Sequence, residues 1–193
     1  LIILDRPKPN GFYVDGPVLD RKYASGGGMQ PVPVVYGMTI GEYARMLIGE
    51  HWLKTKTAYD ANNVDIKIIP CKNYTHKSRY DLPVKPSPNL PYMSSVYKYP
   101  STCLFEGTVL SEGRGTEYPF EIFGHPNLPK NLYSFVPHSM PGAVSSKLYG
   151  DTCYGWNIHN ISFSSKHIEL KYLLKAYKLF PDKQHFFLNQ QSS

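Results

Sequence analysis

The sequence has few cysteines and no long uninterrupted hydrophobic segment. Its three cysteines, Cys71, Cys103 and Cys153, are an odd number, so they cannot all pair within the chain. None of them forms a CxxC pair, which argues against a zinc ribbon. A membrane-spanning helix needs about 18 consecutive apolar residues, and no segment of the sequence approaches that length. No membrane span is therefore predicted.

The signatures of several common enzyme classes are also absent. The sequence has no GxxxxGK[ST] phosphate loop, no helix-opening GxGxxG, no GxSxG elbow and no HExxH zinc pair. The net charge is +6, yet no run of five or six basic residues occurs. A nucleic-acid partner is therefore not predicted. No cofactor and no metal ion is expected either.

The composition that is present is that of a globular protein rich in loops. Hydrophobic residues make up 41% and charged residues 19% of the 193 positions, too apolar for disorder. Tyrosine (16), proline (17) and glycine (15) are all abundant, which favours long loops and aromatic-lined surfaces. Tyrosine rings stack on sugars and also fill cores, and both uses remain open.

The first residues have the pattern of a buried strand. Leu1–Leu4 is apolar and is followed by Asp5 and Arg6, at the kind of strand end where α/β proteins place ligand-binding groups. The chain starts inside this strand without a methionine, so we expect a fragment of a longer protein. Residues 7–31 are dense in proline and glycine, and the predicted domain boundary falls between residues 28 and 29.

Hydrophobic periodicity predicts a mixture of helices and strands beyond that boundary. A helix is expected from Thr39 to about Leu53, with Thr39 and Glu42 forming a capping box. A final helix is expected over Lys166–Phe180, capped by Ser165 and closed by Pro181. Residues 70–101 are predicted to be irregular, and the strands are predicted at 32–35, 64–69, 102–105, 119–123, 133–137 and 154–159.

The segment 106–116 is the strongest candidate for chemistry. Glu106 and Glu112 lie six positions apart on a glycine-rich turn, and glycosidases require two carboxyl groups. Arg114 beside them has the planar guanidinium that binds a ligand carboxylate in two-pronged fashion. It is equally suited to pair with Glu106 or Glu112 and pin the loop. Both interpretations remain open.

Isolated histidines and cysteines are weaker candidates. His125, His138 and His159 each lie near the end of a predicted strand, where a structural role is expected. Cys103 is a conceivable thiol nucleophile, but it stands in an apolar run and is expected to be buried.

Five groups of residues together resemble one known family. CLFEGTVLSEGRGT at 103–116 is similar to the hallmark of the NamZ-type exo-β-N-acetylmuramidases, long classed as a domain of unknown function. The other similarities are ordered along the chain and spread over nearly all of it: LDRPKPNG with DGP at 4–17 (family LDRPNP…EGP), GMTIGE at 37–42 (family HGMTxGE), PSPNLP at 86–91 (family PPSPNxP), and the pattern of Lys147, Gly150, Cys153 and Gly155.

The resemblance implies a fold and an activity. The fold class expected from it is α/β, with residues 1–28 forming the last strand and exit loop of a Rossmann-like domain and residues 29–193 an α+β domain. The expected activity is release of terminal, non-reducing β-linked N-acetylmuramic acid from peptidoglycan fragments, in the periplasm or outside the cell. The expected partners are amino sugars derived from peptidoglycan and the N-terminal half of the same protein.

The resemblance also suggests roles for individual residues. Glu106 and Glu112 are the predicted catalytic residues, and the predicted substrate-binding residues are Asp5, Arg6, Asn89, Arg114 and Lys147. Muramic acid carries a lactyl carboxylate, which the three cations in that set could bind.

Departures from the family pattern leave two other functions open. Tyr36 and Asp15 replace a usual His and Glu, and the family's Pro-Glu-His-Gly motif, the expected source of the main catalytic carboxylate, is absent. We therefore expect the chain alone not to be a complete enzyme. A non-catalytic glycan-binding module and, more weakly, a thiol enzyme using Cys103 are the alternatives.

Overall fold

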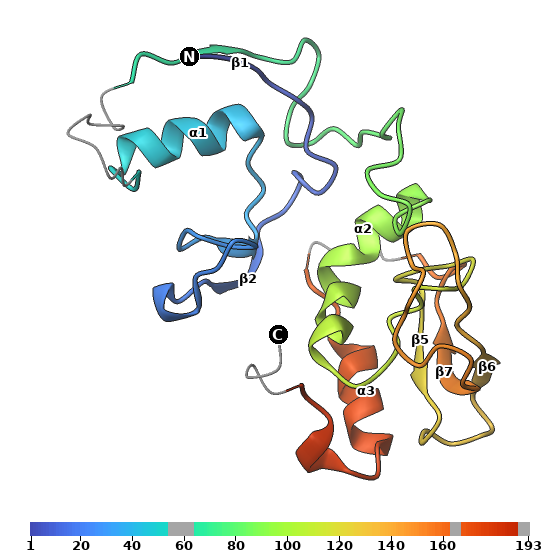
Figure 1. Cartoon of the computed structure of the whole chain (residues 1–193). Helices are drawn as coiled ribbons and strands as arrows, with labels where there is room; N and C mark the ends of the chain where they lie inside the picture. Colours follow the sequence, from blue (N-terminus) through green and yellow to red (C-terminus); the bar gives the residue numbers. More distant parts are fainter. Residues whose placement is uncertain (54–63, 163–166, 189–193) are drawn as a thin grey trace. The chain divides into compact units, whose positions relative to one another are not determined.

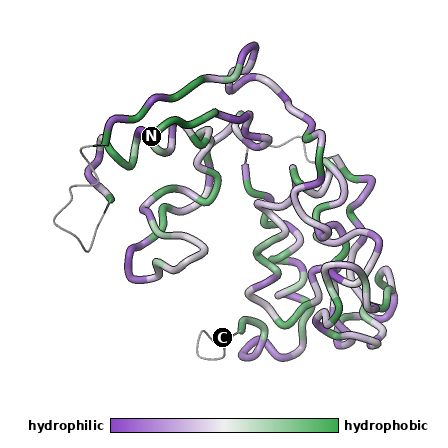
Figure 2. The backbone as a smooth tube through the Cα atoms, turned by 45° about the horizontal axis from the view of Figure 1, so that its top comes forward, coloured by the Kyte–Doolittle hydropathy of each residue, from purple (hydrophilic) through white to green (hydrophobic). Residues whose placement is uncertain are grey.

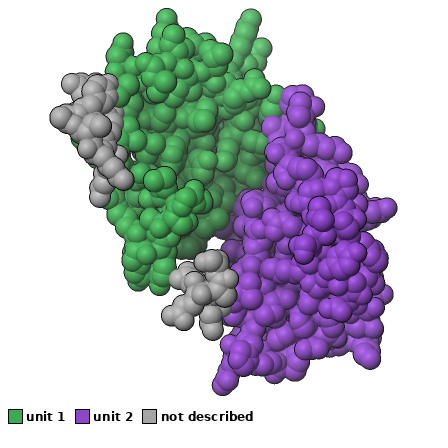
Figure 3. Space-filling model, viewed as in Figure 1, with its two compact units in different colours: residues 1–81 green, residues 82–193 purple. Residues whose placement is uncertain are grey.

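The computed structural model describes residues 1–53, 64–162 and 167–188, and the chain forms two compact units, Leu1–Asp81 and Leu82–Ser193 (Figures 1 and 3). Both units mix helices with small sheets, so the α/β class predicted from the sequence is confirmed in this general form. The Rossmann-like character of the first segment stays a prediction. The predicted boundary at residues 28 and 29 lies inside the first unit, in the connection between two paired strands.

The first unit contains two pairs of short strands and one helix. The parallel pair is β1 (Ile2–Leu4) with β4 (Lys67–Ile69), and the antiparallel pair is β2 (Asp15–Val18) with β3 (Pro33–Val35). A short 3₁₀ helix, η1 (Arg21–Tyr23), lies between β2 and β3. The helix α1 (Ile40–Gly49) follows β3.

Strand β1 is where the sequence predicted it, but it is not buried. Ile2 is 65% exposed and Leu4 is 71% exposed, while Ile3 between them is half-buried. Figure 2 shows the hydrophobic character of this segment. The prediction of burial was wrong for this unit, because within residues 1–53 and 64–81 β4 is the one strand that pairs with β1.

Helix α1 begins at the predicted cap. The Thr39 hydroxyl accepts a hydrogen bond from the Glu42 N–H at 3.2 Å, and the Glu42 carboxylate accepts one from the Thr39 N–H at 2.8 Å. Gly41 lets the helix start approach its neighbours, because a Cβ there would lie 2.7 Å from Ile68 Cγ2 and 2.9 Å from the Asp5 carboxyl. The capping box is thus confirmed, although the helix ends at Gly49 rather than near Leu53.

The second unit is built on a three-stranded antiparallel sheet. Its strand order is β5–β7–β6, with β5 at Ile122–His125, β6 at Tyr133–Phe135 and β7 at Cys153–Asn157. The helical elements are α2 (Met93–Thr102), η2 (Cys103–Gly107), α3 (Lys171–Leu179) and η3 (Lys183–His185). The three strands predicted in this region are confirmed to within a few residues.

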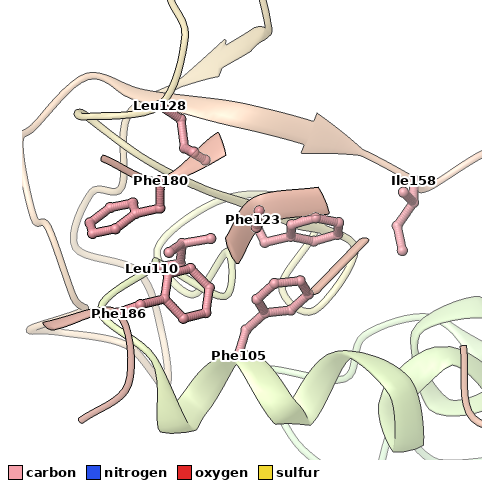
Figure 4. Packing of buried hydrophobic residues seen from close by; sticks show 8 residues of the cluster. Phe105, Leu110, Phe123, Leu128, Ile158, Phe180 and Phe186 are labelled. Atoms are coloured by element: carbon pink, nitrogen blue, oxygen red, sulfur yellow. The ribbon is translucent and has the colours of Figure 1, made fainter. Parts of the chain in front are cut away.

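The core of the second unit brings residues of the sheet, of η2 and of α3 together (Figure 4). Phe105 from η2 stacks on Phe123 from β5 with ring centroids 4.2 Å apart. Ala176 and Phe180 of the α3 segment complete the cluster, together with Leu110, Leu128, Ile158 and Phe186. This packing fixes the loop that follows Phe105, which carries the candidate site.

Two predictions for the second unit were wrong. Residues 93–102, predicted partly as irregular chain and partly as a strand, form α2 and lead into η2. The density of proline suggested a loop, yet Pro100 lies inside the helix. The last helix begins at Lys171 instead of Lys166, and its predicted cap, Ser165, lies outside the described residues. Its end before Pro181 agrees with the prediction.

Candidate active site

The loop after η2 brings four of the predicted site residues into one cluster. We call Glu106, Glu112, Arg114 and Lys147 the Arg114 cluster. Arg114 Nη2 lies 2.7 Å from Glu106 Oε1, and Arg114 Nη1 lies 3.0 Å from Glu112 Oε1. Lys147 Nζ lies 3.1 Å from Glu112 Oε2. The guanidinium therefore bridges two carboxylates, and the ammonium approaches one of them from the other side.

Glycines make this loop possible. Gly113 and Gly115 have φ angles of +84° and +80°, in the left-handed region that side chains disfavour. A Cβ at Gly115 would lie 2.5 Å from the His138 carbonyl oxygen, so the position has no room for one. The tight turning predicted for residues 106–116 is thus confirmed, and Arg114 is held between the two constrained glycines.

The two carboxylates of the cluster have different surroundings. The Glu112 side chain is 2% exposed and has a cation beside each of its oxygens, as a buried charge requires. The Glu106 side chain is 34% exposed, and its second oxygen lies 3.5 Å from the Tyr99 hydroxyl. Burial and the nearby Glu106 charge raise the pKa of Tyr99. Glu106 is the carboxylate of this cluster that solvent can reach.

Lys147 is surrounded by backbone oxygens. Its ammonium lies within 3.4 Å of the carbonyl oxygens of Phe105, Glu106, Thr108 and Leu110, in addition to Glu112. An ammonium group has three N–H bonds to donate. These oxygens already occupy them, so Lys147 holds the loop in shape with no donor left over.

Arg114 has hydrogen-bond donors beyond those used in its two ion pairs. A guanidinium carries five N–H donors, and the Arg114 side chain is 33% exposed. Despite partial burial, the charges of Glu106 and Glu112 raise the pKa of Arg114 above its ordinary value. The guanidinium also lies over the Phe120 ring, 4.9 Å from its centroid. It is a fixed, permanently charged group that faces solvent in part.

Asp5 and Arg6 belong to the first unit, and Asp5 has a structural task there. Its carboxylate accepts hydrogen bonds from the Thr39 hydroxyl at 2.7 Å, the Gly41 N–H at 2.9 Å and the Arg6 N–H at 2.9 Å. Although partial burial acts to raise it, these hydrogen bonds hold the pKa of Asp5 below its ordinary value. Asp5 therefore supports the start of α1.

Asn89, the remaining predicted residue, lines a pocket of the second unit. The cavity is about 320 Å³ in volume. Asn89 Nδ2 donates to the Gly142 carbonyl at 2.9 Å, which ties two loops of its rim together. The cavity is referred to below as the Tyr92 pocket, and its lining residues are Pro88, Asn89, Pro91, Tyr92, Gly115, Thr116, Glu117, Pro119, Met140 and Pro141.

Sequence reasoning missed a buried charge network beside this pocket. Lys98 Nζ lies 2.6 Å from Glu121 Oε1 and also donates to the Ile158 and His159 carbonyls, at 2.8 and 2.7 Å. Glu121 Oε2 lies 2.9 Å from His159 Nδ1. Lys98 is 3% exposed and Glu121 is fully buried. Only His159 had been singled out, because the three residues are far apart in sequence and no local pattern links them.

Other chemistries find little support in the described residues. Burial raises the pKa of the Cys103 thiol to about 11, which disfavours the nucleophilic thiolate at neutral pH. Within residues 1–53, 64–162 and 167–188, no group of three or more His, Cys, Asp and Glu side chains is arranged to hold a metal ion. Among the same residues, no helix is long and apolar enough to cross a membrane.

Comparisons with known proteins give one consistent result. Residues 1–94 match the family model described as exo-beta-N-acetylmuramidase NamZ, N-terminal, and residues 97–191 match its C-terminal counterpart. The peptidoglycan beta-N-acetylmuramidase NamZ of Bacillus subtilis (strain 168) is 33% identical over 204 residues, which cover 96% of this chain and 47% of that protein. The chain thus spans about half the length of this curated relative.

Two solved structures of DUF1343 family proteins from Bacteroides fragilis NCTC 9343 are also similar. One has 49% sequence identity and a TM-score of 0.89, covering 96% of this chain and 52% of the other. The second has 23% identity and a TM-score of 0.71, covering 94% and 51%, and shows the fold alone.

Proposed function

Because the chain belongs to the NamZ family of exo-β-N-acetylmuramidases, we propose that it is part of a glycoside hydrolase that acts on peptidoglycan. The proposed reaction releases terminal, non-reducing β-linked N-acetylmuramic acid from peptidoglycan fragments. The proposal extends to a periplasmic or secreted location, where such fragments arise, and to cooperation with an N-terminal half of the same protein.

The observation that carries this proposal is the partly exposed ion pair between Arg114 and Glu106. N-acetylmuramic acid differs from N-acetylglucosamine by a lactyl carboxylate. The partly exposed guanidinium of Arg114 has donors beyond those used by Glu106 and Glu112, so it can bind that carboxylate. Glu106 then lies next to the bound sugar and supplies the carboxyl group that is open to solvent.

The two predicted catalytic glutamates are assigned different tasks in this proposal. Glu106 exchanges protons with the substrate or with water, because its carboxylate is accessible. Glu112 is a positioning residue that fixes Arg114 from its buried side. Glycosidases require a second carboxyl group, which we assign to a part of the protein outside this chain.

The test is hydrolysis of a chromogenic N-acetylmuramic acid glycoside by the full-length protein that contains this chain. Glu106→Gln is expected to lower kcat at least about a hundredfold, the low end of what general acid–base catalysis contributes. Glu50→Gln, at an exposed glutamate at the end of α1 and outside both the Arg114 cluster and the Tyr92 pocket, is the matched control and should retain kcat. Unchanged turnover in Glu106→Gln would remove Glu106 from the chemistry.

Glu112 is buried, and Lys147 donates to backbone oxygens and lies beside Glu112, so neither side chain is available to a substrate. This favours a second candidate function, a non-catalytic glycan-binding module. Of the two carboxylates in the Arg114 cluster only Glu106 is accessible, whereas hydrolysis needs two. Saturable binding of N-acetylmuramic acid by the full-length protein without any release from glycosides would support this module and overturn the enzyme.

A further inference from the structure

The Tyr92 pocket has the size and lining of a small-ligand site. Its volume of about 320 Å³ reaches the lower end of the range, about 300–1,000 Å³, that ligand pockets occupy. One wall is the ring of Tyr92, which is 40% exposed. The rest mixes proline and methionine with the polar residues Asn89, Thr116 and Glu117, so the lining is about as polar as it is apolar. Such a mixed lining is suited to a sugar ring, whose C–H face packs on an aromatic ring while its hydroxyl groups form hydrogen bonds.

The polar groups of the pocket select against an anionic ligand. None of its lining residues is lysine, arginine or histidine, and Glu117 contributes an exposed carboxylate. One N–H of the Asn89 amide donates to the Gly142 carbonyl, which leaves the second N–H and the amide oxygen for a ligand. The carboxylate of Glu117 and this amide oxygen are acceptors that match the hydroxyl and amide N–H donors of a neutral amino sugar, and the second N–H can donate to one of its oxygens.

The aromatic wall is held in place from behind. The Tyr92 ring contacts the rings of Tyr118 and His159, with centroid separations of 5.8 and 5.2 Å. Tyr118 and His159 also contact each other at 4.1 Å. His159 Nδ1 is fixed by Glu121, whose other oxygen is bound by Lys98. A buried ion pair thus anchors the three rings, and a fixed ring loses little freedom when a ligand binds.

We propose that the Tyr92 pocket is a subsite for an uncharged N-acetyl amino sugar, with Tyr92 as its stacking surface and His159 as the residue that positions Tyr92. This inference rests on the proposed function for its choice of sugar class. N-acetylglucosamine is the neutral amino sugar that alternates with N-acetylmuramic acid in peptidoglycan. The pocket then recognises the neighbour of the acidic sugar that Arg114 binds.

Binding measurements on the full-length protein test the subsite independently of turnover. Methyl N-acetyl-β-glucosaminide and N-acetylmuramic acid are titrated separately, with saturation-transfer NMR and calorimetry as readouts. Tyr92→Ala is expected to raise the Kd of the neutral glycoside about tenfold, which corresponds to about 1.4 kcal/mol. Tyr92→Phe, which keeps the ring, and Tyr133→Ala, at an exposed tyrosine on β6, are the controls and should leave this Kd unchanged.

Two further variants test selectivity and positioning. Glu117→Arg replaces the carboxylate of the pocket with a cation and should give N-acetylmuramic acid a second binding event that Tyr92→Ala removes. His159→Ala leaves the Lys98–Glu121 pair intact and should weaken binding of the neutral sugar. It should also weaken the nuclear Overhauser contacts between the rings of Tyr92 and Tyr118, because the Tyr92 ring is no longer held in one orientation, and a role confined to stability would leave these contacts unchanged. His159→Asn, which restores a donor near Glu121, should recover part of the affinity.

The outcomes separate this inference from the proposed enzyme function. A protein that binds the neutral glycoside through Tyr92 but hydrolyses nothing keeps the subsite and loses the enzyme. The subsite would be overturned if the neutral glycoside did not bind, or if Tyr92→Ala left its Kd unchanged. It would also be overturned if the wild-type pocket bound N-acetylmuramic acid more tightly than the neutral glycoside. Preference for a free amine such as lysine would do so as well, because it would assign Glu117 to a cation.

Discussion

Arg114 connects an accessible carboxylate to a buried one, and its geometry suits an arginine more than a lysine. Two separate nitrogens reach Glu106 and Glu112 at 2.7 and 3.0 Å. Arg114→Lys should therefore lower kcat/KM for the muramic acid glycoside nearly as much as Arg114→Ala, because the fork is lost in both. Loss of a charge-assisted hydrogen bond costs about 1.5–3 kcal/mol, or about ten- to a hundredfold in rate.

The same variants distinguish substrate recognition from loop pinning. If Arg114 binds the lactyl carboxylate, Arg114→Ala should also reduce the preference for N-acetylmuramic acid over N-acetylglucosamine glycosides. Arg45→Lys, at an exposed arginine of α1, is the control. A variant with a lower melting temperature and an intact preference would leave only the pinning role.

Lys147 supports a second prediction about a single residue. Lys147→Met removes the ammonium that binds four carbonyl oxygens and one oxygen of buried Glu112. Arg114 still neutralises Glu112 in part, so we expect a loss of about 3 kcal/mol, the low end for a broken buried pair. Urea unfolding of Lys147→Met and of the exposed control Lys130→Met measures it, and equal stabilities would show that the ammonium contributes nothing.

The cysteines should differ in reactivity. Burial raises the pKa values of Cys103 and Cys153, to about 11 and about 12. Their thiols therefore stay protonated at pH 8, and we expect a thiol reagent to label Cys71 first in the folded protein. Mass mapping after brief labelling checks this order. Fast labelling of Cys103, or loss of turnover in Cys103→Ser, would revive the thiol-enzyme interpretation.

At the scale of the element, the start of α1 depends on a carboxylate from the preceding strand end. Asp5→Ala removes the acceptor of the Thr39 hydroxyl and the Gly41 N–H, so we expect the helix to lose about 1 kcal/mol, as for other lost caps. The folded-state pKa of Asp5 lies below its ordinary value of 3.8. Its contribution is therefore complete above that value and disappears as the pH falls through the lowered pKa.

Hydrogen exchange of the α1 amides measures this effect. Wild type and Asp5→Ala should differ in protection at pH 6. Their difference in stability, followed by circular dichroism, should shrink as the pH is lowered below 3.8. Asp65→Ala, at an exposed aspartate of the same unit, should change neither. A constant difference at every pH would mean that the charge of Asp5 is not what supports the helix.

Elements with local signals were predictable from the sequence, and those set by distant contacts were not. The capping box of α1 and the glycines of the 106–116 turn act within a few residues, so their pattern was sufficient. Helix α2 was missed because Pro100 is tolerated inside it only in the context of the folded unit. The Lys98–Glu121–His159 network joins residues 23 and 38 positions apart, which no local pattern encodes.

In the candidate site, too, the residues with a local signal were predictable from the sequence. Glu106, Glu112 and Arg114 were found together because one short loop carries them, and Lys147 was found by resemblance. Whether Arg114 pins the loop or binds a ligand was open in the sequence. The structure adds that the two glutamates differ in side-chain exposure, which is 34% for Glu106 and 2% for Glu112.

At the scale of the whole molecule, the buried hydrophobic side chains are distributed unequally. Val35 is the buried hydrophobic residue of the first unit among those described, whereas the second unit contains two clusters built around Phe123 and Ile122. We therefore expect residues 82–193 to fold alone with a cooperative thermal transition, because burial is the main source of stability. Circular dichroism of this fragment measures it.

Native-state hydrogen exchange provides a second view of the same prediction. Amides of β5 and β7 should exchange last, and those of β1 and β4 much earlier, because β1 is largely exposed. A fragment 82–193 without a cooperative transition, or uniform exchange across both units, would contradict the expected independence of the second unit.

The ammonium of Lys147 is surrounded by backbone carbonyl oxygens and a carboxylate, which are the groups that bind a metal ion in calcium-binding loops. A bound ion escapes on dilution and is removed by a chelator, whereas this cation is attached to the chain by its own side chain. We therefore expect chelators and changes in divalent ions to leave the shape of the loop around Glu112 unchanged. Its vulnerability is chemical instead, because carbamylation or acetylation of that one amine would remove the charge that four carbonyl groups share.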